Sequence, residues 1–129
     1  MKKSIKLIKF IDWGFLRYDT LLIVGKSKAE ALRWLRKRNK NWTTLVESTD
    51  MEKGQAVANH YGGYTVIYIK DFLNSWTDWD MLLHETSHII DYIVSPVYPD
   101  NTELKAYAHE NLFRLCRREI FKALDKNKK

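Results

Sequence analysis

The chain has 129 residues, a mass of 15.4 kDa, 45% hydrophobic residues and 13% aromatic residues. This length fits one domain, residues 1–129, and argues against a dinucleotide-binding dehydrogenase or a complete kinase, which need a second domain. The hydrophobic content rules out wholesale disorder, and the formal net charge of +6 favours acidic partners without specifying a fold.

The first half of the chain predicts strands around one helix. Ser27 and Glu30 have the spacing of a capping box and begin a helix that ends at 39–41. Gly62-Gly63 predicts a turn before 64–69, the best strand in the chain because it is β-branched and aromatic throughout. The other predicted strands are 5–11, 21–24, 43–47 and 55–59.

The second half of the chain predicts two long helices. Thr77 or Asp78 caps the first helix, which runs to about Val94 and is ended by Pro96. The last helix covers about 103–124, and its cap candidates are Asp100, Asn101 and Thr102. Strands with one helix, followed by two helices, predict an α+β fold with a small mixed or antiparallel sheet and the helices grouped against it.

A metal-binding motif lies in the middle of the first long helix, where residues 84–88 read His84-Glu85-Thr86-Ser87-His88. Residues four apart share one helix face, so the two imidazoles can bind one Zn²⁺. Glu85 points about 100° around the helix, where it misses the metal but reaches a water bound to it. The motif therefore predicts two zinc ligands, His84 and His88, and a general base, Glu85. The competing interpretation is an ordinary amphipathic helix with two hydrogen-bonded histidines.

A zinc site also needs a third protein ligand, for which Glu103 is the first candidate. It begins the last helix just beyond a loop with Pro96 and Pro99, which lets that helix return beside the first. The alternative for Glu103 is a capping box with Asp100. Tyr107 lies one turn after Glu103 on the same helix face. It is predicted to stabilise the oxyanion that forms when the carbonyl group of a substrate is attacked. The rival third ligands are Glu110, Asp91 and His109.

Two further side chains carry weaker predictions. Asp91 follows His88 by three residues and shares its helix face, so it is a candidate to accept the second N–H of a metal-bound histidine. The alternative for Asp91 is a solvated acid. His60 stands alone before the glycine turn and is expected on the surface.

These residues resemble the zincin metallopeptidases. The motif and Glu103 match the gluzincin pattern, in which a glutamate on a following helix is the third zinc ligand. The stretch 84–92 is similar to the compact zincins of phages and mobile elements. The resemblance covers about 64–114, and it implies a zincin-like domain with a mixed sheet whose edge strand, here 64–69, binds the substrate antiparallel.

The leading functional prediction is a cytoplasmic zinc metallopeptidase that hydrolyses protein or peptide bonds. Cys116 is the single cysteine, which favours a reducing compartment, and no apolar stretch is long enough to span a membrane. The alternative is a catalytically idle zincin-like binding or phage assembly module. In that alternative, the basic run 33–40 with Trp34 and Trp42 nearby docks onto nucleic acid or an acidic protein. The sequence favours a peptide substrate over nucleic acid and does not predict an oligomeric state.

Overall fold

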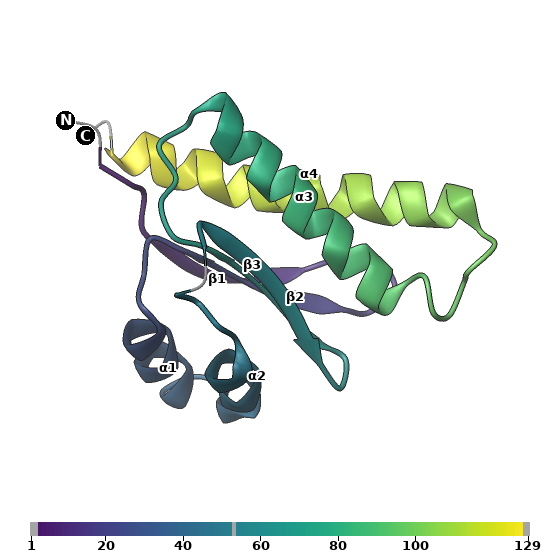
Figure 1. The fold of residues 1–129 in the computed structure, drawn as a ribbon, viewed down its shortest axis with the longest axis horizontal. Coiled ribbons are helices and arrows are strands. Elements are labelled where there is room, and N and C mark those ends of the chain that lie inside the picture. The colour runs from purple at the N-terminus through teal and green to yellow at the C-terminus, as the bar shows by residue number, and fades with distance from the viewer. Residues whose placement is uncertain (1–2, 53, 128–129) are drawn as a thin grey trace.

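The computed structural model describes residues 3–52 and 54–127. Its helices and strands follow one another with short connections (Figure 1). In chain order they are β1 (Leu7–Asp12), β2 (Asp19–Val24), α1 (Lys28–Arg36), the 3₁₀ turn η1 (Lys40–Trp42), α2 (Thr43–Ser48), β3 (Ala56–Tyr61), β4 (Tyr64–Ile69), α3 (Trp76–Ile93) and α4 (Thr102–Asn127).

The strands of the described chain form one mixed sheet in the order β1-β2-β4-β3. The pairs β1–β2 and β3–β4 are antiparallel, whereas β2 and β4 are parallel. Helices α3 and α4 cover one face of the sheet, and α1 and α2 cover the other (Figure 1). The predicted α+β class is confirmed, including the mixed sheet, the helix that carries the motif and the long C-terminal helix.

The two central strands are buried on both faces, which explains why they read as continuous apolar runs. In β2, Leu22 and Val24 belong to the core under α3 and α4, while Leu21 and Ile23 belong to the core under α1 and α2. Strand β4 alternates in the same way, with Ile67 and Ile69 on the α3 side. Helix α3 therefore rests on a rigid apolar surface.

The expected position of the strand 64–69 is wrong. This strand, β4, is central, because β2 pairs with it on one side and β3 on the other. The edge strands of the described sheet are β1 and β3. The physical reason lies in the composition that made 64–69 the strongest strand: an uninterrupted β-branched and aromatic run suits a strand that is covered on both faces and both sides.

The predicted strand 43–47 is also wrong, because these residues form the helix α2. Leu45 and Val46 are adjacent in sequence and both are buried in the same core. A strand would point them to opposite faces, whereas one helical turn presents both to the sheet. The hydroxyl of Thr49 donates to the Leu45 carbonyl oxygen at 2.7 Å and closes this short helix.

The cap of α3 lies two to three residues before the predicted Thr77 or Asp78, whereas the cap of α4 is one of the predicted residues 100–102. Ser75 caps α3: its hydroxyl accepts from Asp78 N, while the Asp78 carboxylate accepts from the backbone N–H groups of Ser75 and Leu73. Asn101 caps α4, since its side-chain oxygen accepts from Leu104 N at 3.0 Å. Neither of these helices, nor any other in the described part of the chain, is long and apolar enough to cross a membrane.

Candidate metal centre

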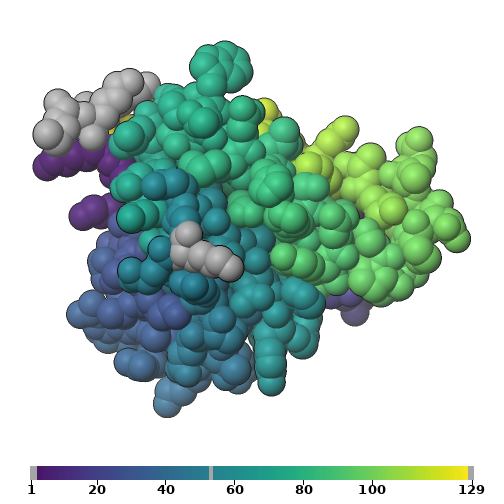
Figure 2. Space-filling view, viewed as in Figure 1, coloured from purple at the N-terminus to yellow at the C-terminus, as the bar shows by residue number. Residues whose placement is uncertain are grey.

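Helix α3 holds the motif in a fixed orientation because one side of the helix is anchored in the core. Leu82, Ile89 and Ile93 are buried against the sheet at the spacing of one helix face. His84 is exposed and His88 is half-buried, so the pair lies on the flank of the helix turned away from this anchor. On the face toward the viewer in Figure 2, α3 lies beside the β3–β4 hairpin.

The two histidines converge on one point. Their Nε2 atoms lie 2.9 Å apart, and the ring planes are nearly perpendicular at 88°. A tetrahedral zinc ion with Zn–N bonds of about 2.0–2.1 Å would hold the same two atoms about 3.3 Å apart. The pair therefore fits a zinc ion if the two Nε2 atoms move apart by a few tenths of an ångström. Without an ion, one ring donates its Nε2 proton to the other, which is the competing interpretation of the pair.

Glu85 completes the cluster from the buried side. One of its carboxylate oxygens and the histidine nitrogens all lie within 4.8 Å of one another, and no other such group of His, Cys, Asp or Glu occurs in the described residues. Only 5% of Glu85 is exposed. Burial raises the pKa of the Glu85 carboxyl, while the nearby charges of His84 and His88 act in the opposite direction. A carboxylate with a raised pKa is suited to accept a proton near neutral pH.

The structure does not bring Glu103 to the histidine pair. Glu103 is exposed at the start of α4 and stands outside the cluster of ligand atoms. The residue of α4 that forms hydrogen bonds with α3 at the level of the motif is His109, which follows Glu103 by six residues. At 1.5 Å of rise per residue, that offset is about 9 Å along the helix axis. The role of Glu103 as third ligand stays a prediction, and its capping box with Asp100 is replaced by the Asn101 cap.

The remaining candidates on α4 also lie apart from the histidine pair. The ring of Tyr107 contacts that of Phe15 in the β1–β2 loop at 4.9 Å, and Glu110 is exposed. His109 Nε2 lies 2.9 Å from the Thr86 hydroxyl and 3.2 Å from the Leu83 carbonyl oxygen. These two groups face α4, on the opposite flank of α3 from the Nε2 atoms of His84 and His88, so His109 joins the two helices.

Asp91 is exposed and contacts a serine rather than a histidine. The Ser95 hydroxyl donates to its Oδ1 at 3.4 Å, a long contact near the end of α3. Within residues 3–52 and 54–127, no hydrogen bond joins Asp91 to His84 or His88. This geometry favours the solvated acid over the partner of a metal-bound imidazole.

Two aromatic neighbours of the site were not predicted. The ring of Tyr92 is stacked at 6.0 Å from His88, and the ring of His60 is stacked on Tyr92 at 4.3 Å. His60 is exposed, as expected, but it connects the edge strand β3 to the motif flank of α3. Tyr92 follows His88 by four residues, so helix periodicity alone could have placed it on the histidine flank.

Comparison with known proteins does not assign the chain to a family. No protein-family model matches the chain, and the searches of curated proteins and of solved structures found no match to it. The chemistry of the site therefore rests on the motif and on the positions of its side chains.

Proposed function

We propose that the chain is a zinc-dependent, zincin-like peptidase that hydrolyses peptide bonds. The observation that supports it most is the convergence of the two Nε2 atoms at 2.9 Å with a buried carboxylate beside them. His84 and His88 would hold the metal, and Glu103 remains the candidate for the third position. The single buried cysteine fits a reducing compartment, so we place the enzyme in the cytoplasm.

Glu85 supplies the proton transfer in this proposal. A zinc ion held by the two histidines would provide Lewis acidity and lower the pKa of a water molecule to about 7. Glu85 would accept a proton from the water that attacks the substrate carbonyl carbon, and it would return this proton to the leaving nitrogen when the C–N bond breaks. Burial raises the pKa of the Glu85 carboxyl, which makes this group a stronger proton acceptor than an exposed glutamate. Stabilisation of the oxyanion by Tyr107, whose ring contacts that of Phe15, stays a prediction.

The open edge of β3 is the place where an extended substrate can pair with the sheet. Lys70 N donates to the Gln55 carbonyl oxygen, which makes these residues a hydrogen-bonded antiparallel pair. By the alternation of such pairs, Val57 and Asn59 also bond to β4, while the N–H and C=O of Ala58 and His60 point to the free edge. Strand addition there would carry a peptide past the histidine flank of α3.

Replacement of Glu85 by glutamine tests the proposal. Glu85→Gln keeps the shape and both histidines but removes the base, so zinc content should stay the same while peptide hydrolysis falls by at least about 100-fold. The readout is cleavage of a denatured protein substrate or a peptide library by the zinc-loaded protein, followed by mass spectrometry.

The matched control is Glu47→Gln, which makes the same chemical change at an exposed glutamate on α2, a residue that is not a candidate ligand. This variant should hydrolyse as fast as the parent protein. Equal activity of Glu85→Gln and the parent would contradict the assignment of Glu85 as base. A zinc-loaded parent protein that cleaves no peptide of the library would favour the idle binding or assembly module.

A further inference from the structure

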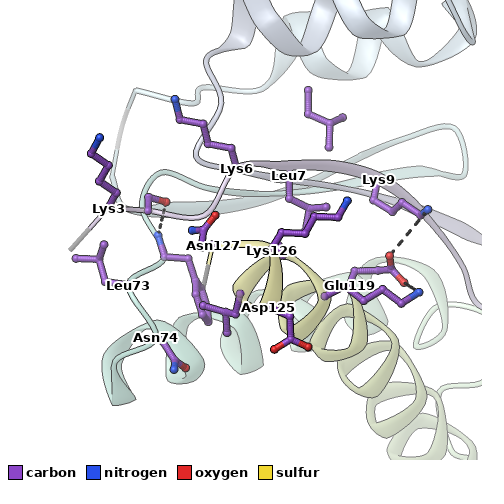
Figure 3. Close-up of a pocket in the computed structure, with 16 residues that line it drawn as sticks. Lys3, Lys6, Leu7, Lys9, Leu73, Asn74, Glu119, Asp125, Lys126 and Asn127 are labelled. Atoms are coloured by element: carbon purple, nitrogen blue, oxygen red, sulfur yellow. Dashed lines mark hydrogen bonds and ion pairs between the residues drawn. The ribbon is translucent and has the colours of Figure 1, made fainter. Parts of the chain in front are cut away.

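A basic groove lies at the opposite end of α4 from the predicted metal ligand Glu103. It has a volume of about 1200 Å³ and is formed by the N-terminal segment with β1, the loop before α3 and the last turns of α4 (Figure 3). Its lining carries two acids, Glu119 and Asp125, against five lysines. These lysines are Lys3, Lys6, Lys9, Lys122 and Lys126.

The positive charge of this groove is largely available to a ligand. Glu119 is shared by Lys9 at 3.9 Å and Lys122 at 3.3 Å, so one carboxylate offsets two ammonium groups. Within the described residues, Lys3, Lys6 and Lys126 make no ion pair. Figure 3 shows Lys3 and Lys6 extending from the N-terminal segment on the same side. A polyanion could approach them without displacing an internal partner.

An aromatic hollow adjoins the basic groove, and Asn74 lines both. This hollow has a volume of about 540 Å³ and lies between the start of α3 and the middle of α4. Its aromatic lining is Trp76, Trp79, Phe113 and Phe121. Trp76 is 88% exposed, and Arg117 adds a guanidinium 5.9 Å from the Phe113 ring. An exposed indole at a basic surface offers a flat face that no residue of the described chain covers.

We propose that the groove and the hollow together bind single-stranded nucleic acid. A single strand of nucleic acid carries one phosphate and one flat base per nucleotide. The lysines of the groove can bind the phosphates, and the exposed rings of the adjoining hollow can stack on the bases. Phosphates contact Lys3, Lys6 and Lys126, and one or two bases stack on Trp76 and its neighbours. The surface is separate from the histidine cluster, so this proposal does not rest on peptidase activity.

The basic surface of α1 is a weaker candidate for the same ligand. Trp42 is only 4% exposed, because its ring packs against Phe10 and Tyr64. Trp34 is already covered by the guanidinium of Arg38 at 4.4 Å from the ring centre. The cations of α1 therefore lack free aromatic faces beside them, and they serve as a matched control.

The test is fluorescence anisotropy with a labelled 20-nucleotide oligothymidylate and the full chain. Arg117, which lines the hollow, adds a fourth phosphate contact to those of Lys3, Lys6 and Lys126. Four contacts predict a slope of about −2.8 for log affinity against log salt, or about a 50-fold loss between 50 and 200 mM. Lys6→Gln/Lys126→Gln should reduce this slope by about 1.4. Trp76→Ala should weaken binding by about 5-fold or more, and Trp76→Phe should restore most of the loss.

The control Arg33→Gln/Lys37→Gln removes the same charge from α1 and should leave the slope and the affinity unchanged. Three results would overturn the proposal: no binding of the oligonucleotide at 50 mM salt, binding that depends on α1 rather than on the groove, and insensitivity to Trp76→Ala. Equal competition by a duplex of the same length would show that base stacking on the aromatic rings does not contribute to binding, and it would contradict the assignment to single strands. Binding of a polyglutamate peptide in place of the oligonucleotide would assign the surface to an acidic protein.

Discussion

At the scale of single residues, the backbone is most constrained where β2 ends. Gly25 has a φ of +68°, and its N–H donates to the Ile69 carbonyl oxygen at 3.0 Å. A Cβ at this position would lie 2.2 Å from the Ile5 carbonyl oxygen. Both the dihedral angle and the close approach of the N-terminal segment therefore require glycine.

Gly25→Ala should lower the free energy of unfolding by more than about 2 kcal/mol, since the left-handed conformation and the backbone clash add. Gly14→Ala is the matched control, because Gly14 has a φ of +66° but a Cβ added there would meet no heavy atom within 4 Å. That control should lose only about 1–2 kcal/mol. Urea denaturation measures both, and equal losses would show that the approach of Ile5 does not constrain this site.

Some residues of the candidate site can be predicted from a local sequence pattern, whereas others depend on contacts between segments that are distant in sequence. His84, Glu85 and His88 follow from helix periodicity within five residues, and the structure places their ligand atoms together. The stacking of His60 on Tyr92 joins β3 to α3 across a long sequence separation, and no local pattern specifies that contact. The third ligand depends on how α4 is rotated and shifted against α3, which one sequence does not determine.

At the scale of elements, β3 is an edge strand of the described sheet, with β4 on one side and an open edge on the other. Its register with β4 directs the N–H of Asn59 into the ladder and that of His60 to the open side. Proline lacks an N–H, so it tests this assignment directly.

Asn59→Pro should cost about 3 kcal/mol more than Asn59→Ala, because a ladder hydrogen bond to Val66 is lost. His60→Pro should cost no more than about 1 kcal/mol beyond His60→Ala. Comparison with alanine at the same position separates the backbone effect from the loss of the Asn59 and His60 side-chain contacts. Thermal unfolding supplies the readout, and the reverse order of costs would mean that the register is shifted by one residue.

The elements that were predicted correctly are those with a clear pattern of hydrophobic residues or a recognisable helix cap. The Ser27–Glu30 capping box, the strand 64–69 and both long helices are confirmed. The position of 64–69 within the sheet was missed because pairing partners are distant in sequence. The helix α2 was missed because six residues with two adjacent apolar side chains fit a strand as well as a helix.

At the scale of the whole molecule, the core buries one thiol whose ionisation makes stability depend on pH. Cys116 is fully buried between α4 and the sheet core, and burial, with a smaller contribution from Glu119, raises its pKa to about 12. In the unfolded chain the thiol has a pKa of about 8.5. The folded thiol therefore keeps its proton at a pH where the unfolded thiol releases it. Stability is fully present below pH 8.5 and declines as the pH rises toward 12.

Between pH 7.5 and pH 10 this single thiol should reduce the free energy of unfolding by about 2 kcal/mol. The stability difference between the parent chain and Cys116→Ala should shrink by that amount over the same range, since all other titrations are shared. Urea denaturation at each pH measures the difference. Parallel curves for the two proteins would mean that the thiol ionises equally in the folded and unfolded states.

We propose that the two imidazoles and the adjoining carboxylate form a metal centre, and the metal content of the purified chain is the decisive measurement. After isolation without chelators and dialysis against micromolar Zn²⁺, elemental analysis should find one zinc per chain. Glu85→Gln should retain that zinc, whereas His84→Ala and His88→Ala should each lose it. A parent chain without stoichiometric metal, or histidine variants that bind as much zinc as the parent, would show that His84 and His88 do not form a metal centre.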